Sequence, residues 1–116
     1  MSGNYFKHKI VFVVDTREIF EKVKVFAETA AKEFDIQKVV LFGSVVRGAF
    51  NEYSDIDVAV IVAESDIDIL ESEFRLYKMR RNIDHRIEPI LFVGTVDDSG
   101  FLEEILKNGK VVFEAA

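Results

Sequence analysis

Residues 39–62 read VVLFGSVVRGAFNEYSDIDVAVIV, and this stretch decides the fold. An apolar run ends at Gly43 and Ser44, ten residues follow, and Asp55 and Asp57 then open a second apolar run rich in β-branched residues. The pattern predicts a strand, a tight turn and a second strand that begins with two carboxylates. Side chains alternate between the faces of a strand, so Asp55 and Asp57 should share one face, with Cα atoms about 6.5 to 7 Å apart.

The two carboxylates and the turn together suggest a binding site. Carboxylates held side by side repel each other unless a cation lies between them. Mg²⁺ suits this position, because it is a hard cation that uses one or two carboxylates and takes its other oxygens from water and phosphate. The turn at Gly43 and Ser44 could offer backbone N–H groups and a hydroxyl to that same phosphate.

Length and composition describe one globular domain, which we expect to span residues 1–116. A chain of 116 residues can bury a core but has no room for a catalytic domain plus a substrate domain. The sequence is 49% hydrophobic and 31% charged, as soluble proteins are, and it contains no cysteine for disulfides or thiolate metal sites. No apolar run approaches the ~18 to 20 residues of a membrane span, and the N-terminus lacks a secretory signal. We therefore expect a cytoplasmic protein.

The charge balance limits the partners. A net charge of −6 and a pI near 4.9 argue against a large nucleic-acid surface, which needs many lysine and arginine side chains. A small nucleotide that carries its own Mg²⁺ remains compatible. Six basic residues nevertheless fall between positions 75 and 86. They form either the solvated side of a helix or a contact for a nucleotide or a partner.

Outside the opening stretch, hydrophobic periodicity predicts alternating strands and helices. Pro89 favours an edge position or a bulge for its strand, and Gly109 stands where a C′ glycine would end the last helix. The order β-α-β-(turn)-β-α-β-α-β predicts an α/β (α+β) fold, with a mixed sheet and helices packed chiefly on one face. The predicted elements are strands at 9–14, 38–42, 55–62, 86–93 and 110–113, helices at 15–34 and 66–82, a helical turn at 45–49 and a last helix around 101–106.

The predicted helix at 66–82 has a clear apolar stripe. Its members, Ile67, Leu70, Phe74 and Tyr77, recur at helical spacing, and the basic residues lie mostly off this stripe. We therefore expect the stripe to form the buried face of the helix.

A third carboxylate would complete a metal site. Glu88 lies within the strand at 86–93 and Asp84 lies just before it; we favour Glu88, because its place in the strand matches that of Asp55 and Asp57 in theirs. Three carboxylates can hold two Mg²⁺ ions that stabilise the attacking and leaving oxygens of an in-line phosphoryl displacement.

Arg47 lies shortly after the glycine-serine turn. Together with Ser44 it could anchor the β and γ oxygens of a triphosphate, since a guanidinium fork matches phosphate geometry. The alternative is a surface ion pair of Arg47 with Glu52 or Asp55.

Residues 38–63 resemble the minimal nucleotidyltransferase (MNT) domain, a small member of the DNA polymerase β-like nucleotidyltransferase superfamily. The resemblance rests on LFGSxxRG and SDIDV, in which a glycine-serine pair, an arginine-glycine pair and the D-x-D of Asp55 and Asp57 occur at matching distances. The remainder of the chain agrees in the order of its elements. The resemblance implies the nucleotidyltransferase fold.

The resemblance also implies an activity, which is Mg²⁺-dependent transfer of a nucleoside monophosphate, usually AMP from ATP, to a hydroxyl with release of pyrophosphate. It implies that Asp55 and Asp57 are catalytic metal ligands, that Gly43 and Ser44 form the phosphate turn, and that Glu88 is the third acidic position. Many such short proteins are encoded beside a HEPN-domain partner and act as antitoxins, some by adenylylating a tyrosine of that partner. We therefore expect an adenylyltransferase with an antitoxin role.

Two other functions remain open. An antitoxin could mask a HEPN-type partner by contact alone, although a pure binding module gains nothing from repulsive paired carboxylates. Addition of nucleotides to RNA ends conflicts with the net charge of the chain. Association with itself or with another protein is also expected, because the domain is small and rich in phenylalanine.

Overall fold

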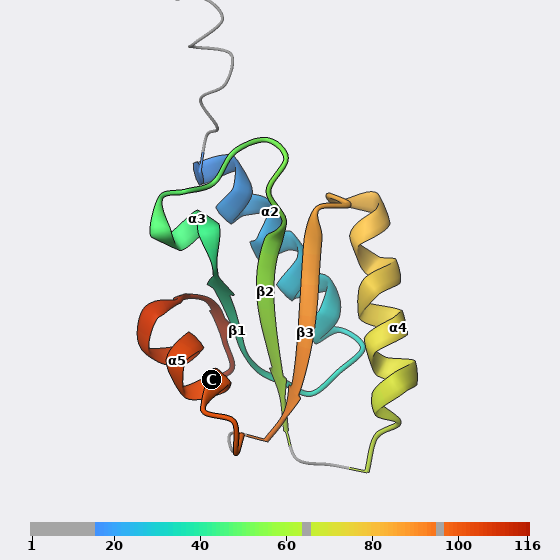
Figure 1. Cartoon of the computed structure of the whole chain (residues 1–116). Helices are drawn as coiled ribbons and strands as arrows, with labels where there is room; N and C mark the ends of the chain where they lie inside the picture. The colour runs from blue at the N-terminus through green and yellow to red at the C-terminus, as the bar shows by residue number, and fades with distance from the viewer. Residues whose placement is uncertain (1–15, 64–65, 95–96) are drawn as a thin grey trace, which may run out of the picture.

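The computed structural model describes residues 16–63, 66–94 and 97–116; the predicted strand at 9–14 and the predicted helix start at Asp15 lie outside them. Four strands form one sheet, with helices on both faces (Figure 1). None of the described helices is long and apolar enough to span a bilayer. The elements are α2 (Thr16–Ala31), β1 (Ile36–Phe42), α3 (Ser44–Arg47), β2 (Ile56–Val62), α4 (Ile69–Met79), the 3₁₀ turn η1 (Arg80–Asn82), β3 (Ile87–Val93), α5 (Phe101–Asn108) and β4 (Lys110–Glu114).

The sheet is mixed, as predicted, and its strand order is β3-β2-β1-β4. β1 is antiparallel to both β2 and β4, whereas β2 and β3 run parallel. A parallel pair needs a crossover connection, and the segment that contains α4 supplies it. β2 is therefore a central strand. Pro89 lies in β3 at the edge of the sheet, where the absence of an N–H donor is tolerated, so its predicted edge position is confirmed.

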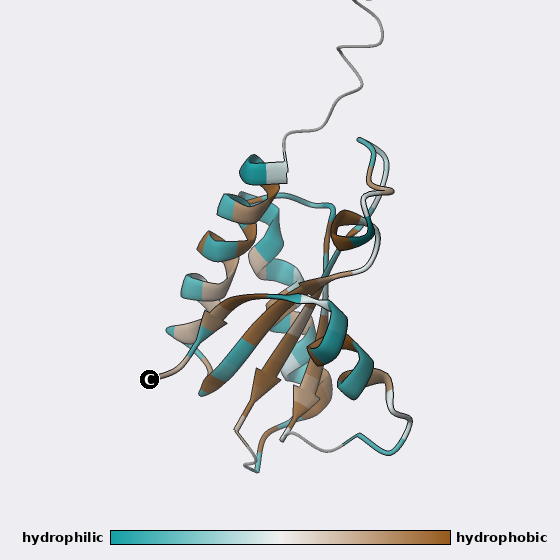
Figure 2. Cartoon of the chain, turned by 90° about the vertical axis from the view of Figure 1, so that its left-hand side faces the viewer, coloured by the Kyte–Doolittle hydropathy of each residue, from teal (hydrophilic) through white to brown (hydrophobic). Residues whose placement is uncertain are grey.

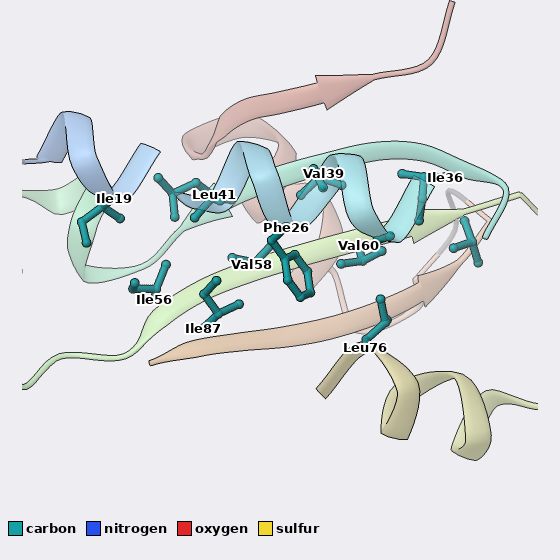
Figure 3. Close-up of a cluster of buried hydrophobic side chains, with 14 residues drawn as sticks. Ile19, Phe26, Ile36, Val39, Leu41, Ile56, Val58, Val60, Leu76 and Ile87 are labelled. Atoms are coloured by element: carbon teal, nitrogen blue, oxygen red, sulfur yellow. The ribbon is translucent and has the colours of Figure 1, made fainter. Parts of the chain in front are cut away.

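Buried apolar side chains hold the sheet between its helices. Phe26 of α2 and Leu76 of α4 point into one layer against the strands, as Figure 3 shows. The strands are almost entirely hydrophobic, whereas the helices alternate between hydrophobic and hydrophilic residues (Figure 2). The two longest helices thus share one face of the sheet, as predicted, and α5 lies on the other. The cluster beneath α5 consists of Val40, Ala59, Ile61, Leu102 and Ile105.

The buried face of α4 is not the predicted one. Leu70, Phe74 and Tyr77 are 79%, 62% and 45% exposed, so the prediction that they face the core is wrong; of the predicted stripe, Ile67 alone packs against the core. Leu76, beside a serine one turn earlier, faces the sheet instead. The helix carries apolar residues on two sides, and helical periodicity does not distinguish which side meets the sheet.

Gly109 ends α5, but not through the left-handed conformation of a C′ glycine. Its φ of −80° and ψ of 175° are extended. A Cβ atom at this position would lie 2.5 Å from Cγ1 of Val40 and 2.7 Å from the carbonyl oxygen of Ile105. A glycine is needed here because α5 and β1 leave no space for a side chain.

Candidate active site

Three side chains form a row across neighbouring strands on the α5 face of the sheet. In the register of the sheet, Phe42 of β1 pairs with Asp57 of β2, and Asp57 pairs with Glu88 of β3. Asp57 precedes Ala59 by two residues, and Ala59 belongs to the cluster beneath α5, so strand alternation puts both on this face. The structure therefore brings Asp57 and Glu88, two of the predicted site residues, to adjacent positions.

The glycine-serine turn lies directly against Asp57. Gly43 has a φ of +80°, a conformation that favours glycine, and a Cβ atom there would overlap Oδ2 of Asp57. The short helix α3 begins at Ser44, and the backbone N–H groups of Val46 and Arg47 donate to the Gly43 carbonyl oxygen at 3.2 and 3.1 Å. The Gly43-Ser44 turn and the Asp57 side chain are thus packed against each other.

A cleft of about 450 Å³ opens between this turn and α5. Its volume lies in the range of about 300–1,000 Å³ that is typical of small-molecule sites. Gly43, Arg47 and Asp57 line one side of it. The rings of Phe42 and Phe101 meet edge to face, with centroids 5.8 Å apart, and both line the cleft. The cleft therefore combines an apolar, aromatic part with a charged part.

Asp57 has two negatively charged neighbours, Asp55 and Glu88, and one positively charged neighbour, Arg47. Burial raises the pKa of Asp57 above its ordinary value, the negative charges of Asp55 and Glu88 raise it further, and the Arg47 guanidinium lowers it. Among the described residues Arg47 makes no ion pair with Glu52 or Asp55, so the alternative of such a surface ion pair is wrong. Arg47 instead lines the cleft.

Glu88 is held by Arg80. Nη1 of Arg80 donates to Oε1 of Glu88 at 3.1 Å and to the Ile87 carbonyl oxygen at 2.9 Å, and the guanidinium lies 3.6 Å from the centroid of the Tyr77 ring. Asp55 is exposed just before β2. Within the described residues, consequently, no three acidic or histidine side chains are gathered as ligands of one cation.

Asp84, the alternative third carboxylate, is buried among basic groups. Nε and Nη2 of Arg86 donate to its two oxygens at 3.0 and 2.7 Å, and Nζ of Lys22 donates to Oδ2 at 3.0 Å. The hydrogen bonds from Arg86 hold the pKa of Asp84 well below its ordinary value, although burial opposes them. The oxygens of Asp84 are thus already used by the fold.

Three of the basic residues between positions 75 and 86 form ion pairs within the chain. Arg75 pairs with Glu33, and its guanidinium lies 4.7 Å from the centroid of the Phe34 ring. Arg80 and Arg86 pair with the acidic side chains already described. These three arginines connect elements of the fold.

Sequence reasoning missed the residues that α5 contributes to the cleft. Phe101, Glu104 and Asn108 line it opposite the glycine-serine turn. Their spacing of three and four residues indicates one side of a helix, but the side on which α5 meets the sheet depends on packing. The edge-to-face contact of Phe101 with Phe42 is a tertiary contact that local sequence patterns do not predict.

Comparison with known proteins identifies the family. Residues 21–116 match the family described as Polymerase beta, Nucleotidyltransferase. The chain belongs to this nucleotidyltransferase family. A relative from Methanocaldococcus jannaschii, whose name is "Putative protein adenylyltransferase", is 32% identical over 99 residues, which are 79% of this chain and 96% of the relative.

Solved structures show the same fold as this nucleotidyltransferase. A "putative nucleotidyltransferase from Sulfolobus solfataricus" matches with a TM-score of 0.61 and 18% identity, over 85% of this chain and 83% of the other. A chain from the crystal structure described as "the toxin-antitoxin with AMP-PNP" matches with a TM-score of 0.57 and 20% identity, over 88% and 75% of the two chains. The predicted nucleotidyltransferase fold is therefore confirmed.

The donor set of this nucleotidyltransferase suits a hard divalent cation. Its carboxylate oxygens are the ligands that Mg²⁺ prefers, and a bound cation would oppose both the burial and the neighbouring negative charges that raise the pKa of Asp57. If Asp55 and Asp57 held such an ion, two carboxylates would be enough in number, because Mg²⁺ takes one or two carboxylates and completes its shell with water and phosphate oxygens. Oε1 of Glu88 accepts from Arg80, so this ion pair competes with a cation for that oxygen of Glu88.

Proposed function

We propose that this nucleotidyltransferase transfers AMP from ATP to a hydroxyl group on a partner protein. The observation that carries the proposal is the position of Asp57, which is packed against the Gly43 turn at the mouth of a cleft of nucleotide size. The relative named as a protein adenylyltransferase supports both the donor and the class of acceptor. The neighbour from the structure described as the toxin-antitoxin with AMP-PNP supports a role in a toxin-antitoxin pair, in which we propose that this chain is the antitoxin. By resemblance to the MNT domain, the partner is a HEPN-domain toxin.

Asp55 and Asp57 would hold Mg²⁺, with Glu88 as a third ligand when two ions bind. The ions would supply positive charge to the triphosphate and lower the pKa of the acceptor hydroxyl. The chain itself would orient the donor: the backbone of Gly43, which lines the cleft, and the neighbouring hydroxyl of Ser44 would bind phosphate oxygens.

Other parts of the cleft bind and orient the nucleotide. Arg47 would pair with the triphosphate charge, because a guanidinium offers two parallel N–H donors to a phosphate. Phe42 and Phe101 would pack against the nucleoside and exclude water from that end of the cleft. The adenine would thus lie toward α5 and the phosphates toward the glycine-serine turn.

Transfer of label is the direct test of the proposal. The protein is incubated with Mg²⁺, a co-expressed HEPN partner and ATP labelled in the α-phosphate, and the label is expected on the partner protein. The same reaction with label in the γ-phosphate should leave the partner unlabelled, because pyrophosphate is released. Label from the γ-phosphate on the partner would instead show phosphorylation and would contradict the proposal.

A binding module that masks the partner by contact is the second candidate. The exposed apolar side chains of α4 favour it, since such residues often lie in protein interfaces. Asp57→Asn distinguishes the two functions, because it removes the charge and keeps the shape. Full neutralisation of the partner by this variant would favour masking, whereas loss of neutralisation together with loss of label would favour catalysis.

A further inference from the structure

The outer side of α4 carries a largely exposed apolar surface, on which the Arg80 guanidinium stacks against the ring of Tyr77. Leu70, Phe74 and Tyr77, which we call the α4 stripe, are all exposed and follow one another by four and three residues. In Figure 1 the helix lies at the margin of the molecule beside β3. Large side chains grouped on one face of a surface helix are typical of interfaces rather than of solvent-exposed helices.

The spacing of the α4 stripe is that of a coiled-coil seam. Leu70, Phe74 and Tyr77 occupy successive d, a and d positions of a heptad. In this register Glu71 and Lys78 are both e positions, one heptad apart and on the same flank of the stripe. Nζ of Lys78 lies 5.3 Å from the centroid of the Phe74 ring, which confirms that this ammonium group borders the stripe.

The charges of the helix divide at Phe74. Within α4, Glu71 and Glu73 precede it, and Arg75 and Lys78 follow it. Asp66 and Asp68 before the helix and Arg80 and Arg81 after it repeat these signs, although Arg75 and Arg80 pair with Glu33 and Glu88 of the same chain. Asp and Glu near the start of a helix and Lys and Arg near its end also suit the helix dipole, which explains the sign of the charges. The dipole does not explain why the apolar stripe is centred on the point where the sign changes.

We propose that α4 packs antiparallel against α4 of a second copy of this chain. A two-fold axis through the stripe near Phe74 brings the acidic half of each helix against the basic half of the other. In antiparallel helices the e positions of one face the e positions of the other, so Glu71 of each copy meets Lys78 of its partner. In this arrangement the apolar seams face each other, and the charges that border them are complementary. The inference does not depend on the proposed function.

The first test removes the apolar contact. Sedimentation equilibrium of the wild-type chain is expected to show a dimer, and Phe74→Glu should raise the dissociation constant by about a hundredfold or more, since it buries charge at the centre of the interface. Leu106→Glu is the matched control, because it adds the same charge to an exposed position of α5, on the opposite face of the sheet. A wild-type chain that stays monomeric at roughly 100 μM and low ionic strength would overturn the proposal.

The second test is a charge cycle that identifies the geometry. Glu71→Lys and Lys78→Glu should each raise the dissociation constant by about tenfold, because each replaces two symmetric attractions with two repulsions. The double variant should dimerise like the wild type, since the pairs are restored with reversed sign. An equimolar mixture of the single variants should form the heterodimer. Residues 71 and 78 are too far apart on one helix to interact, so these restorations require a second copy.

The outcomes of this cycle are decisive. Restored dimerisation in the double variant and in the mixture supports the antiparallel arrangement. A loss of helix stability cannot explain this pattern, because the double variant carries both substitutions and would be destabilised by each of them. A dimer that none of these charge changes affects would overturn the proposed arrangement. If the wild type is monomeric but binds a HEPN partner through this face, the occupant is another protein and the proposal is wrong.

Discussion

A Cβ atom at residue 43 would overlap Oδ2 of Asp57, so the glycine-serine turn and the central carboxylate of the site are packed against each other. Gly43→Ala should therefore both destabilise the fold and abolish nucleotide transfer. Gly48→Ala separates the two effects, because Gly48 has a similar φ of +78° and nothing within 4 Å of a Cβ atom. We expect Gly48→Ala to cost about 1 kcal/mol of unfolding free energy through backbone strain alone and to keep activity when folded. Equal loss of activity in the two folded variants would contradict this distinction.

Asp57→Asn should abolish transfer and, at neutral pH, raise the stability of the metal-free protein. The pKa of Asp57 is raised in the folded state, so its ionised form costs stability as the pH rises through that pKa. Asparagine has the same shape and no such cost. Thermal unfolding in a chelating buffer is expected to show a variant more stable than the wild type at neutral pH, with the difference shrinking toward acidic pH. A variant that is less stable at neutral pH would show that the carboxylate is stabilised by its surroundings.

Glu88→Gln tests the third ligand. If Glu88 leaves Arg80 to bind a cation, the variant should require a higher Mg²⁺ concentration for half-maximal transfer, by about 10- to 100-fold. Asp84→Asn, compared as folded protein, should leave this Mg²⁺ dependence unchanged, because Arg86 and Lys22 occupy the Asp84 oxygens. If the Mg²⁺ concentration for half-maximal transfer rises in the Asp84 variant alone, Asp84 and not Glu88 is the third ligand.

Asp84 should instead control the stability of the protein in acid. Its pKa lies well below the ordinary value, so its contribution is fully present above the unfolded-state pKa of about 3.9 and is lost as the pH falls further toward its folded-state value. At neutral pH, Asp84→Asn should cost about 1–3 kcal/mol, because two partly buried cations lose their counter-charge. Urea unfolding at several pH values measures this, with Asp35→Asn as the control at an exposed aspartate.

Phe101→Ala should weaken binding of the nucleotide more than it slows the chemical step. The ring lines the cleft and contacts Phe42 and Phe92 edge to face, on the part of the cleft that we assign to the nucleoside. Removal of an aromatic wall is expected to raise KM for ATP by about tenfold and to leave kcat within about twofold. A fall in kcat with an unchanged KM would place Phe101 nearer the reacting atoms than we propose.

The sequence predicts the sheet well, because the strands are continuous apolar runs with sharp ends. Gly43 and Asp55 mark the end of β1 and the approach to β2 within one residue of their observed places. The alternation rule also gives the residues that share a face within each strand, Asp55 with Asp57 and Arg86 with Glu88. It does not give their register, which depends on how β3 pairs with β2.

Features that depend on packing between elements were not predictable. The apolar stripe of α4 has ideal helical spacing but lies outward, because Leu76 on the other side fits the core better. The Arg80–Glu88 ion pair and the α5 side of the cleft likewise depend on how separate elements pack together, which local sequence patterns do not predict. Local pattern thus predicts the residues of the proposed phosphate side, whereas those of the proposed nucleoside side depend on tertiary structure.

The close passage of Gly109 beside Val40 sets the width of the cleft. Gly109 lines the cleft and also ends α5 against β1, where a side chain has no room. Any substitution there would act as a wedge and tilt the helix that carries Phe101 away from the glycine-serine turn. Because Gly109 has no side chain, α5 packs closely against β1. The width of the cleft is therefore fixed by backbone packing and not by a ligand.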